Sequence, residues 1–274
     1  QKKSSVFLSV VIPLLNEEES LQELASQLEN ELPKSGGENY EIIFVDDGST
    51  DNSWEELKKL KKRNSRFSAI RFRRNYGKSA ALAVGFSKAK GQFVITMDAD
   101  LQDDPAEVQH LVAKLKDGYD LVSGWKKKRY DPVQKTVPSK LFNFVTSVFS
   151  GIRLHDFNCG LKAYRRDVVK SLDVYGEMHR YLPALAYMQG FRVTEMPVTH
   201  RPRKYGKTKF GASRFIKGFL DLLTVVYTNK FARRPLHFFG TLGVLFIAAG
   251  FIIDSVLFVQ WLQGTTFLSN RPLA

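Results

Sequence analysis

Cysteine is nearly absent from this sequence, with one residue, Cys159, in a chain of 274. A single cysteine excludes an internal disulfide, and no metal site can be built from this residue type alone. The low cysteine content favours a reducing compartment, although Cys159 is equally compatible with an ordinary buried thiol.

Long apolar runs are also scarce, because residues 236–262 form the only one. This run contains two ionisable residues, His237 and Asp254, and it is about long enough to cross a ~30 Å hydrocarbon layer as a helix. It predicts one transmembrane span, and a buried helix of a soluble protein is the alternative. Asp254 is costly in lipid, so it is expected to face another helix or subunit, which favours a homo-oligomer, or to lie near the far interface.

Acidic residues are scarce just before this run, where residues 201–234 contain ten Lys or Arg and one acid, Asp221. The positive-inside bias places residues 1–234 on the cytoplasmic side of an inner membrane, and no N-terminal signal peptide is expected. The expected organisation is a cytoplasmic domain over residues 1–209, a juxtamembrane amphipathic helix over 210–234 and a transmembrane region over 235–274, with a second span starting near 271.

The net charge of +13 is compatible with nucleic acid, an anionic membrane surface or a phosphorylated substrate. No nucleic-acid-binding motif accompanies the basic residues, so no nucleic-acid partner is expected. Residues 138–152 and 210–231 combine large apolar residues with Lys, which is typical of amphipathic helices that lie in a membrane interface. Packing into the protein core is the alternative for both segments.

Short apolar runs alternate with helical patterns through the first half of the chain. This alternation is typical of an α/β fold with a mostly parallel sheet, in which right-handed crossovers connect the strands. Five strands are expected, at residues 6–13, 40–45, 67–72, 92–97 and 120–125, and residues 161–164 are strand-like.

Three acids directly follow the strand expected at 92–97, within residues 98–103. Pro105 fits the first turn of the next helix, so the acids lie beyond the carboxyl end of a strand, where open α/β sheets bind ligands. In extended backbone Asp98, Asp100 and Gln102 point the same way, and their oxygens suit Mg²⁺ or Mn²⁺ that also binds substrate phosphates. The alternative is a strand-to-helix turn in which Asp acts as a cap.

Three basic segments each allow two interpretations. Residues 77–79 are not a phosphate-binding P-loop, because Phe72 stands where that motif needs glycine; Lys78 either neutralises a phosphate or is solvated. Residues 126–129 are either a solvated loop or a site for an anionic acceptor. Residues 203–209 either fold over a pyrophosphate or are solvated.

Four motifs, in order along the chain, resemble those of the inverting family 2 glycosyltransferases, which have the Rossmann-like GT-A fold. They are residues 13–17, 45–49 and 98–102 and the basic loop that contains Arg203, Gly206, Thr208 and Lys209. Within that family the chain is most similar to polyprenyl-phosphate glycosyltransferases, such as dolichol-phosphate mannose synthases and bacterial glucosyltransferases of the GtrB type. The resemblance covers nearly the whole chain.

The resemblance implies a nucleotide-sugar-binding domain over residues 1–209 with Mg²⁺ or Mn²⁺ as cofactor. The implied metal ligands are Asp98, Asp100 and Gln102. The implied nucleotide contacts are Pro13, Leu15, Glu17, Phe44, Asp46, Asp98 and Ala99, together with Arg203 and Lys209, which would close over the diphosphate. Asp156 stands where the family places a catalytic base, and Asp100 is the other residue expected in catalysis. The acceptor phosphate is expected to meet Lys126, Arg129, Lys135 and Ser139.

The implied reaction is metal-dependent transfer of a hexose to a polyprenyl phosphate such as undecaprenyl phosphate, at the cytoplasmic face of the membrane. UDP-glucose is the expected donor, and inversion gives a β-linked product. Transfer from GDP-mannose and a non-enzymatic, membrane-tethered nucleotide-binding module are the alternatives. A processive polysaccharide synthase is disfavoured, because it needs several spans and a Gln-x-x-Arg-Trp motif that this sequence lacks.

Overall fold

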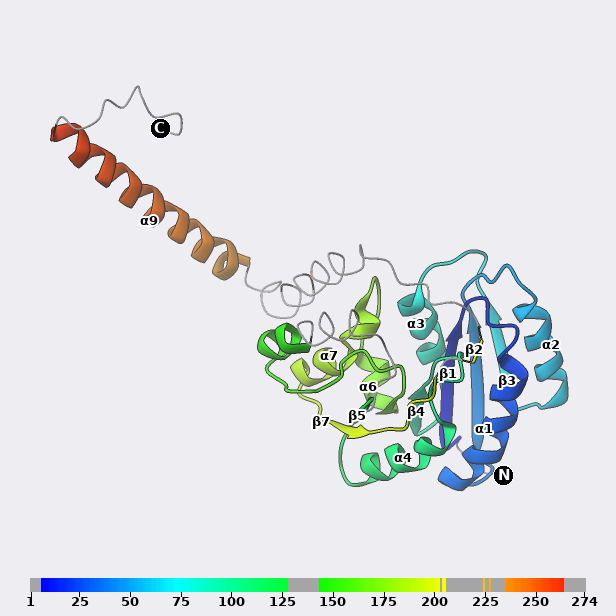
Figure 1. Ribbon diagram of the computed structural model, residues 1–274. Coiled ribbons are helices and arrows are strands. Elements are labelled where there is room, and N and C mark those ends of the chain that lie inside the picture. The colour runs from blue at the N-terminus through cyan, green and yellow to red at the C-terminus, as the bar shows by residue number, and fades with distance from the viewer. Residues whose placement is uncertain are drawn as a thin grey trace. The chain divides into compact units, whose positions relative to one another are not determined.

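Figure 1 shows a computed structural model of the chain, in which residues 6–127, 143–202, 204–205, 224, 227 and 235–263 are described. The chain divides into two compact units, Gln1–Val225 and Val226–Ala274. The first unit contains a seven-stranded sheet with its helices, and the second contains one long helix, α9 (Pro235–Leu262).

The five strands expected from the alternating pattern all form and belong to one sheet. They are β1 (Leu8–Leu14), β2 (Tyr40–Asp46), β3 (Phe67–Arg71), β4 (Phe93–Thr96) and β5 (Leu121–Trp125). The order of the sheet is β3-β2-β1-β4-β6-β5-β7. Neighbouring strands from β3 to β4 are parallel, so the prediction of an α/β fold with a mostly parallel sheet is confirmed.

Two further strands, β6 (Lys162–Arg165) and β7 (Val193–Pro197), complete the sheet. β6 lies between β4 and β5 and runs antiparallel to both, whereas β7 is parallel to β5. Most of β6 falls within the segment predicted as strand-like. β7 has no counterpart among the predicted strands, because none of its five residues is fully buried and they form no continuous apolar run.

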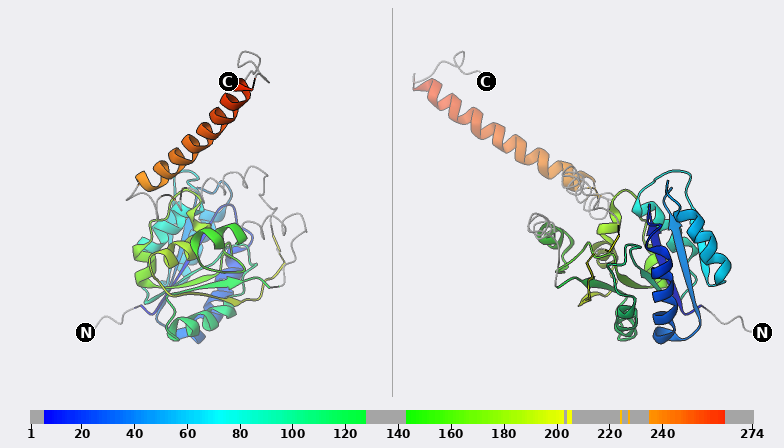
Figure 2. Two further views of the ribbon diagram at one scale, coloured as in Figure 1. Left: turned by 90° about the vertical axis from the view of Figure 1, so that its left-hand side faces the viewer. Right: turned by 45° about the vertical axis from the view of Figure 1, so that its right-hand side comes forward.

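Helices cover both faces of the sheet (Figures 1 and 2). One face is covered by α1 (Leu21–Gly36), α2 (Ser53–Arg63) and α4 (Val108–Lys116), and the other by α3 (Lys78–Lys88), α6 (Arg166–Ser171) and α7 (Leu182–Met188). The described chain also contains two short 3₁₀ helices, η1 (Pro105–Glu107) and η2 (Met178–Arg180), and a helix over residues 143–150. α1 buries Leu21, Leu24, Ala25, Leu28 and Leu32, whose spacing forms one helical face.

The carboxyl ends of β1 and β4 meet where the direction of the sheet order reverses. The chain first adds β2 and β3 on one side of β1 and then crosses to β4 on its other side, and such a switch point is where open α/β sheets bind ligands. Asn16, which follows β1, and Leu101, which follows β4, both have positive φ, of 54° and 63°. This conformation is uncommon outside glycine and gathers at functional sites, so the backbone marks the same edge of the sheet as the acidic residues.

The second unit contains α9, which has 28 residues and is long and apolar enough to cross a membrane by length and composition. This helix contains the whole span predicted at residues 236–262. The second span predicted near residue 271 lies outside the described residues, and so does nearly all of the juxtamembrane helix predicted over 210–234.

Candidate functional site

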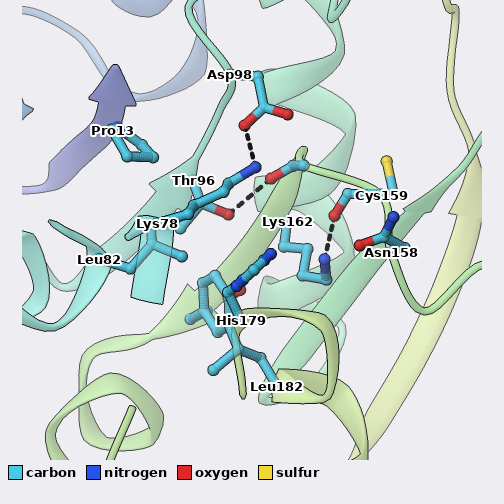
Figure 3. Close-up of a pocket in the computed structure, with 12 residues that line it drawn as sticks. Pro13, Lys78, Leu82, Thr96, Asp98, Asn158, Cys159, Lys162, His179 and Leu182 are labelled. Carbon is cyan, nitrogen blue, oxygen red and sulfur yellow. Dashed lines mark hydrogen bonds and ion pairs between the residues drawn. The ribbon is translucent and has the colours of Figure 1, made fainter. Parts of the chain in front are cut away.

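A small recess opens at the switch point, between the ends of β1, β4 and β6 (Figure 3). Its volume is about 280 Å³ including its open mouth. It is lined by Pro13 of β1, Lys78 and Leu82 of α3, Thr96 and Asp98 at the end of β4, Asn158, Cys159, Gly160, Lys162 and Tyr164 around the start of β6, and His179 and Leu182. Most of these side chains are polar, so the recess suits a polar ligand.

Lys78 and Asp98 form an ion pair in this recess, with 2.5 Å between Nζ and Oδ1, and about a third of each side chain is exposed. Lys78 begins α3, and the carboxylate of Asp47 holds the preceding turn by accepting hydrogen bonds from the N–H groups of Tyr76 (2.7 Å) and Gly77 (2.9 Å). Burial alone would raise the pKa of Asp98, but the neighbouring lysines, Lys78 foremost, together outweigh burial and lower this pKa to about 2. Asp98 is therefore ionised at neutral pH and holds a cation against itself.

Asp100 and Gln102 follow on the same loop, on either side of the positive φ of Leu101. Asp100 is buried, and its Oδ1 accepts a hydrogen bond from the Gln102 N–H at 3.2 Å. Among the described residues, no three His, Cys, Asp or Glu side chains converge as a metal-binding group. Asp98 and Asp100 therefore do not fit a cage made of protein ligands alone, but they fit Mg²⁺ or Mn²⁺ held by one or two carboxylates with water and substrate phosphates.

Asp103, the third acid of this loop, is paired within the protein. It is buried, accepts a long hydrogen bond from the Asp98 N–H (3.4 Å) and lies 3.3 Å from the Nζ of Lys126. Burial alone would lower the pKa of Lys126, but the surrounding acidic groups, Asp103 foremost, together outweigh burial and raise it. Lys126 thus ties the end of β5 to the acidic loop, and any contact with an acceptor phosphate would compete with this ion pair.

The predicted nucleotide residues after β1 and β2 are brought together because these strands are paired. Hydrogen bonds connect the two loops beyond them: Asn16 Oδ1 accepts from the Thr50 N–H (2.8 Å), and Ser53 Oγ accepts from the Glu17 N–H (2.9 Å). Leu15 and Glu17 are half-buried. The two loops therefore form one continuous rim beside the recess end of β1.

Asp46, at the end of β2, is fully buried. Its Oδ1 accepts a hydrogen bond from the Ser49 N–H at 2.8 Å, and the Nε of Arg71 lies 3.4 Å from its Oδ2. The carboxylate is thus held in place by the turn that follows it and by a neighbouring guanidinium.

Phe44 and Ala99 are placed differently from the other predicted nucleotide residues. Phe44 is fully buried in the main core and packs edge-on against Phe67, with 6.0 Å between ring centroids. Ala99 is also buried in this core. The Phe44 side chain therefore has no exposed face and supports β2 from within the core. The predicted contact of Phe44 with a nucleotide stays a prediction and would fall to its backbone.

Asp156 lies in the loop before β6 and is 2% exposed. Its Oδ1 accepts a hydrogen bond from the Asn158 N–H at 3.1 Å. The preceding residue, His155, stacks on Trp125 with ring centroids 4.1 Å apart and pairs with Glu195. These contacts hold the loop in place. Asn158, two residues after Asp156, lines the recess.

Several predicted site residues lie outside the described residues, so the structure says nothing of their placement. They are Arg129, Lys135 and Ser139, expected near the acceptor phosphate, and Arg203 and Lys209, expected near the diphosphate.

The recess also contains two residues that the sequence did not mark, Lys162 and His179. Ser79 Oγ lies 3.0 Å from the His179 Nδ1 and accepts a hydrogen bond from the His179 N–H (3.1 Å). Burial, followed by the charge of Lys78, lowers the pKa of His179 well below its usual value, so the ring is neutral. A lysine inside an otherwise apolar strand was the available signal for Lys162, and the segment around His179 has no pattern at all.

Comparisons with known proteins show the family of this chain. Residues 9–173, more than half of the chain, match the family model described as Glycosyl transferase family 2. The chain is 37% identical, over 98% of its length and 81% of the relative's, to dodecaprenyl-phosphate galacturonate synthase of Rhizobium johnstonii. It is also 37% identical, over 96% of its length and 78% of the relative's, to undecaprenyl-phosphate 4-deoxy-4-formamido-L-arabinose transferase of Pseudomonas savastanoi pv. phaseolicola.

Solved structures show the same fold at low identity. Glucosyl-3-phosphoglycerate synthase from Mycobacterium tuberculosis, in complex with Mn²⁺, UDP and phosphoglyceric acid, matches with a TM-score of 0.62 at 16% identity, over 81% of this chain and 78% of that chain. A mannosyltransferase from Pyrobaculum calidifontis, in complex with GDP-Man and Mn²⁺, matches with a TM-score of 0.56 at 19% identity, over 81% and 63%.

The sheet topology and the solved structures show the GT-A fold, as the motifs predicted. The chain belongs to glycosyl transferase family 2.

Proposed function

We propose that this chain transfers one sugar from a nucleotide sugar to a polyprenyl phosphate at a membrane surface. The observation that carries the proposal is the extent of the two curated likenesses, which cover 98% and 96% of the chain and so include α9 as well as the family segment 9–173. A polyprenyl chain costs about 0.8 kcal/mol per methylene to remove from a bilayer. An enzyme acting on this lipid must therefore work at the membrane, and α9 gives it an anchor.

For the donor side, Asp98, Asp100 and Gln102 would hold Mg²⁺ or Mn²⁺ beside the diphosphate. When bound, the cation offsets the negative charge that grows on the departing diphosphate. The Lys78 ammonium already occupies Asp98, which supports a cation site there. Pro13, Leu15, Glu17 and Asp46 would bind the base and ribose along the rim, and Arg203 and Lys209 would close over the diphosphate.

For the acceptor side, the phosphate oxygen of the lipid would attack the anomeric carbon in a single displacement, so an α-linked donor gives a β-linked product. A phosphomonoester has its second pKa near ~6 and is largely dianionic at neutral pH. Asp156 is therefore not needed to remove a proton and would orient the acceptor or the sugar hydroxyls. Lys126, Arg129, Lys135 and Ser139 would meet the acceptor phosphate.

The membrane arrangement is part of the same proposal. α9 would span the inner membrane, with the catalytic unit on the cytoplasmic side because the flank before α9 is strongly basic. Asp254 within α9 would face a second helix, which favours a homo-oligomer.

UDP-glucose is the donor expected from the sequence, and GDP-mannose is the runner-up. The test is a panel of labelled nucleotide sugars, each incubated with the full chain, Mg²⁺ and undecaprenyl phosphate and followed by lipid extraction. Label in a lipid-linked monosaccharide supports the proposal. A labelled polymer would instead indicate a processive synthase, and nucleotide binding without any lipid product would indicate a non-enzymatic binding module.

A further inference from the structure

Lys162 is a buried lysine with no carboxylate partner in the described part of the chain. The residue is 3% exposed, and its Nζ donates a hydrogen bond to the carbonyl oxygen of Cys159, three residues earlier (Figure 3). Among the described residues, no Asp or Glu lies within the 4.0 Å of an ion pair with this nitrogen. Burying an unpaired ammonium costs several kcal/mol. Because Lys162 lines the recess, an anion on a ligand is the partner that its position allows.

Hydrogen-bond donors predominate around Lys162. Ser79 Oγ accepts from the His179 backbone N–H, so its own proton is available for Nδ1, and the ring proton then lies on Nε2. The buried hydroxyl of Tyr164 also lines the recess and lacks a well-formed hydrogen bond to a described residue. The carboxylate in the lining, Asp98, is already paired with a lysine. This lining suits a group that accepts hydrogen bonds and carries negative charge.

The recess lies beside the metal loop and not on it. Asp98 belongs to both, but Asp100, Gln102, Glu17 and Asp46 do not line the recess. The recess is small, because its volume of about 280 Å³ includes the open space at its mouth. The recess can therefore receive a small group of a nucleotide sugar and not the whole molecule. Because Asp100 and Gln102 lie outside its lining, we assign an anion beside Lys162 to the sugar and not to the diphosphate.

Resting on the proposed sugar transfer to polyprenyl phosphate, we propose that Lys162 binds a carboxylate on the donor's sugar. The donor class is then a nucleotide hexuronate, in place of the neutral UDP-glucose expected from the sequence. The ammonium makes a charge-assisted hydrogen bond to the carboxylate, and the His179 ring supplies a second donor. Lys162 contacts the substrate without joining in bond making, which makes it a specificity-determining residue.

The test measures binding of matched donors to the full chain in detergent by titration calorimetry. The probes are UDP, UDP-glucose with UDP-glucuronate, and UDP-galactose with UDP-galacturonate. Within at least one pair the wild type is expected to bind the acid about tenfold or more tightly than the neutral sugar. Lys162→Met should remove this preference while changing the affinity for UDP less than about twofold, and Lys162→Arg should keep the preference.

Lys170→Met is the matched control, because Lys170 also donates to backbone carbonyls, those of Phe86 and Ser87, but lies outside the recess. It should leave the acid preference intact. Equal affinity of the wild type for acid and neutral donors would overturn the inference. So would a Lys162→Met variant that loses affinity for UDP and for every nucleotide sugar by the same factor. Wild type that binds uridine nucleotides without an acid preference contradicts this inference alone, whereas no binding of any uridine nucleotide also contradicts the proposed uridine donor.

Discussion

At the scale of single residues, the site separates charges that are paired within the protein from charges that face the recess. Asp47 holds the turn before α3 through two backbone N–H groups, and Asp103 pairs with Lys126. Lys162, by contrast, is buried and donates a hydrogen bond to the carbonyl oxygen of Cys159, with no acidic partner among the described residues. The first group stabilises the loops around the site, and the second defines what the site can bind.

Asp156→Asn separates positioning from nucleotide binding. The asparagine oxygen can still accept the hydrogen bond from the Asn158 N–H, so the loop should keep its conformation, but the charge that orients the acceptor or sugar is lost. We expect kcat for lipid-linked sugar formation to fall about 100-fold or more, while the Kd for nucleotide measured by calorimetry changes less than twofold. Equal losses in kcat and in nucleotide affinity would refute this division of roles.

His179 makes stability depend on pH in a defined direction. Its pKa in the folded chain is well below the ~6.5 of the unfolded chain, so the unfolded chain binds the proton first as pH falls. Protonation of His179 in the unfolded chain therefore leaves the folding free energy unchanged above about pH 6.5. Below that pH it lowers the free energy of unfolding by at most about 1.4 kcal/mol per pH unit.

Thermal melts at pH 7.5 and pH 5.5 should therefore show a smaller loss of stability on acidification for His179→Gln than for the wild type. His110→Gln, which removes an exposed histidine of α4, is the control and should behave like the wild type. An unchanged acid sensitivity in His179→Gln would show that this ring is not buried as described.

At the scale of elements, the strands and helices with strict apolar spacing were predictable, and those set by tertiary pairing were not. β1, β2 and α1 have buried positions that repeat with the period of their own structure. The antiparallel direction of β6 depends on its insertion between β4 and β5, which no local pattern encodes. β7 is a half-buried edge strand whose residues do not alternate clearly.

The same distinction applies to the site. Asp98, Asp100 and Gln102 could be predicted because they directly follow a buried strand, and the motifs beside them resembled those of a known family. Lys162 and His179 reach the recess from β6 and η2, far along the chain. Phe44 was assigned to the nucleotide from its position beside a motif, but its side chain turns to the core face of β2, which a motif position does not reveal.

Gly91 lies in the turn before β4, where the backbone closely approaches β1. A Cβ at this position would lie 2.5 Å from the Ser9 nitrogen and 2.6 Å from the Phe93 oxygen, both backbone atoms that cannot easily move. Gly91→Ala should lower the free energy of unfolding by about 1–3 kcal/mol, measured by urea denaturation in detergent. The neighbouring exposed Lys90→Ala should stay within about 0.5 kcal/mol of the wild type. Equal stability of both variants would mean that the turn is looser than the structure describes.

At the scale of the whole molecule, a catalytic unit with a basic flank and one apolar helix belong to a single chain of net charge +13. Charge alone would give a peripheral attachment to anionic lipid that weakens as salt shortens the Debye length to about 3 Å at 1 M. An inserted helix would hold regardless of salt. The two kinds of attachment can therefore be distinguished by a wash.

Membranes that contain the chain should retain it through washes with 1 M salt and with alkaline carbonate, because α9 would be embedded in hydrocarbon. The measurement is the fraction of chain that sediments with the membranes, compared with a peripheral marker protein in the same sample. Release of the chain into the supernatant together with the marker would contradict a transmembrane role for α9.

Mass spectrometry of the lipid product tests the central claim most directly. The full chain is incubated with undecaprenyl phosphate, Mg²⁺ and a mixture of neutral and acidic uridine-diphosphate sugars, and the organic extract is analysed with and without EDTA. The expected product is undecaprenyl phosphate carrying one sugar residue, formed without EDTA and absent with it. Unmodified lipid under both conditions, or the same product with and without EDTA, would contradict this expectation.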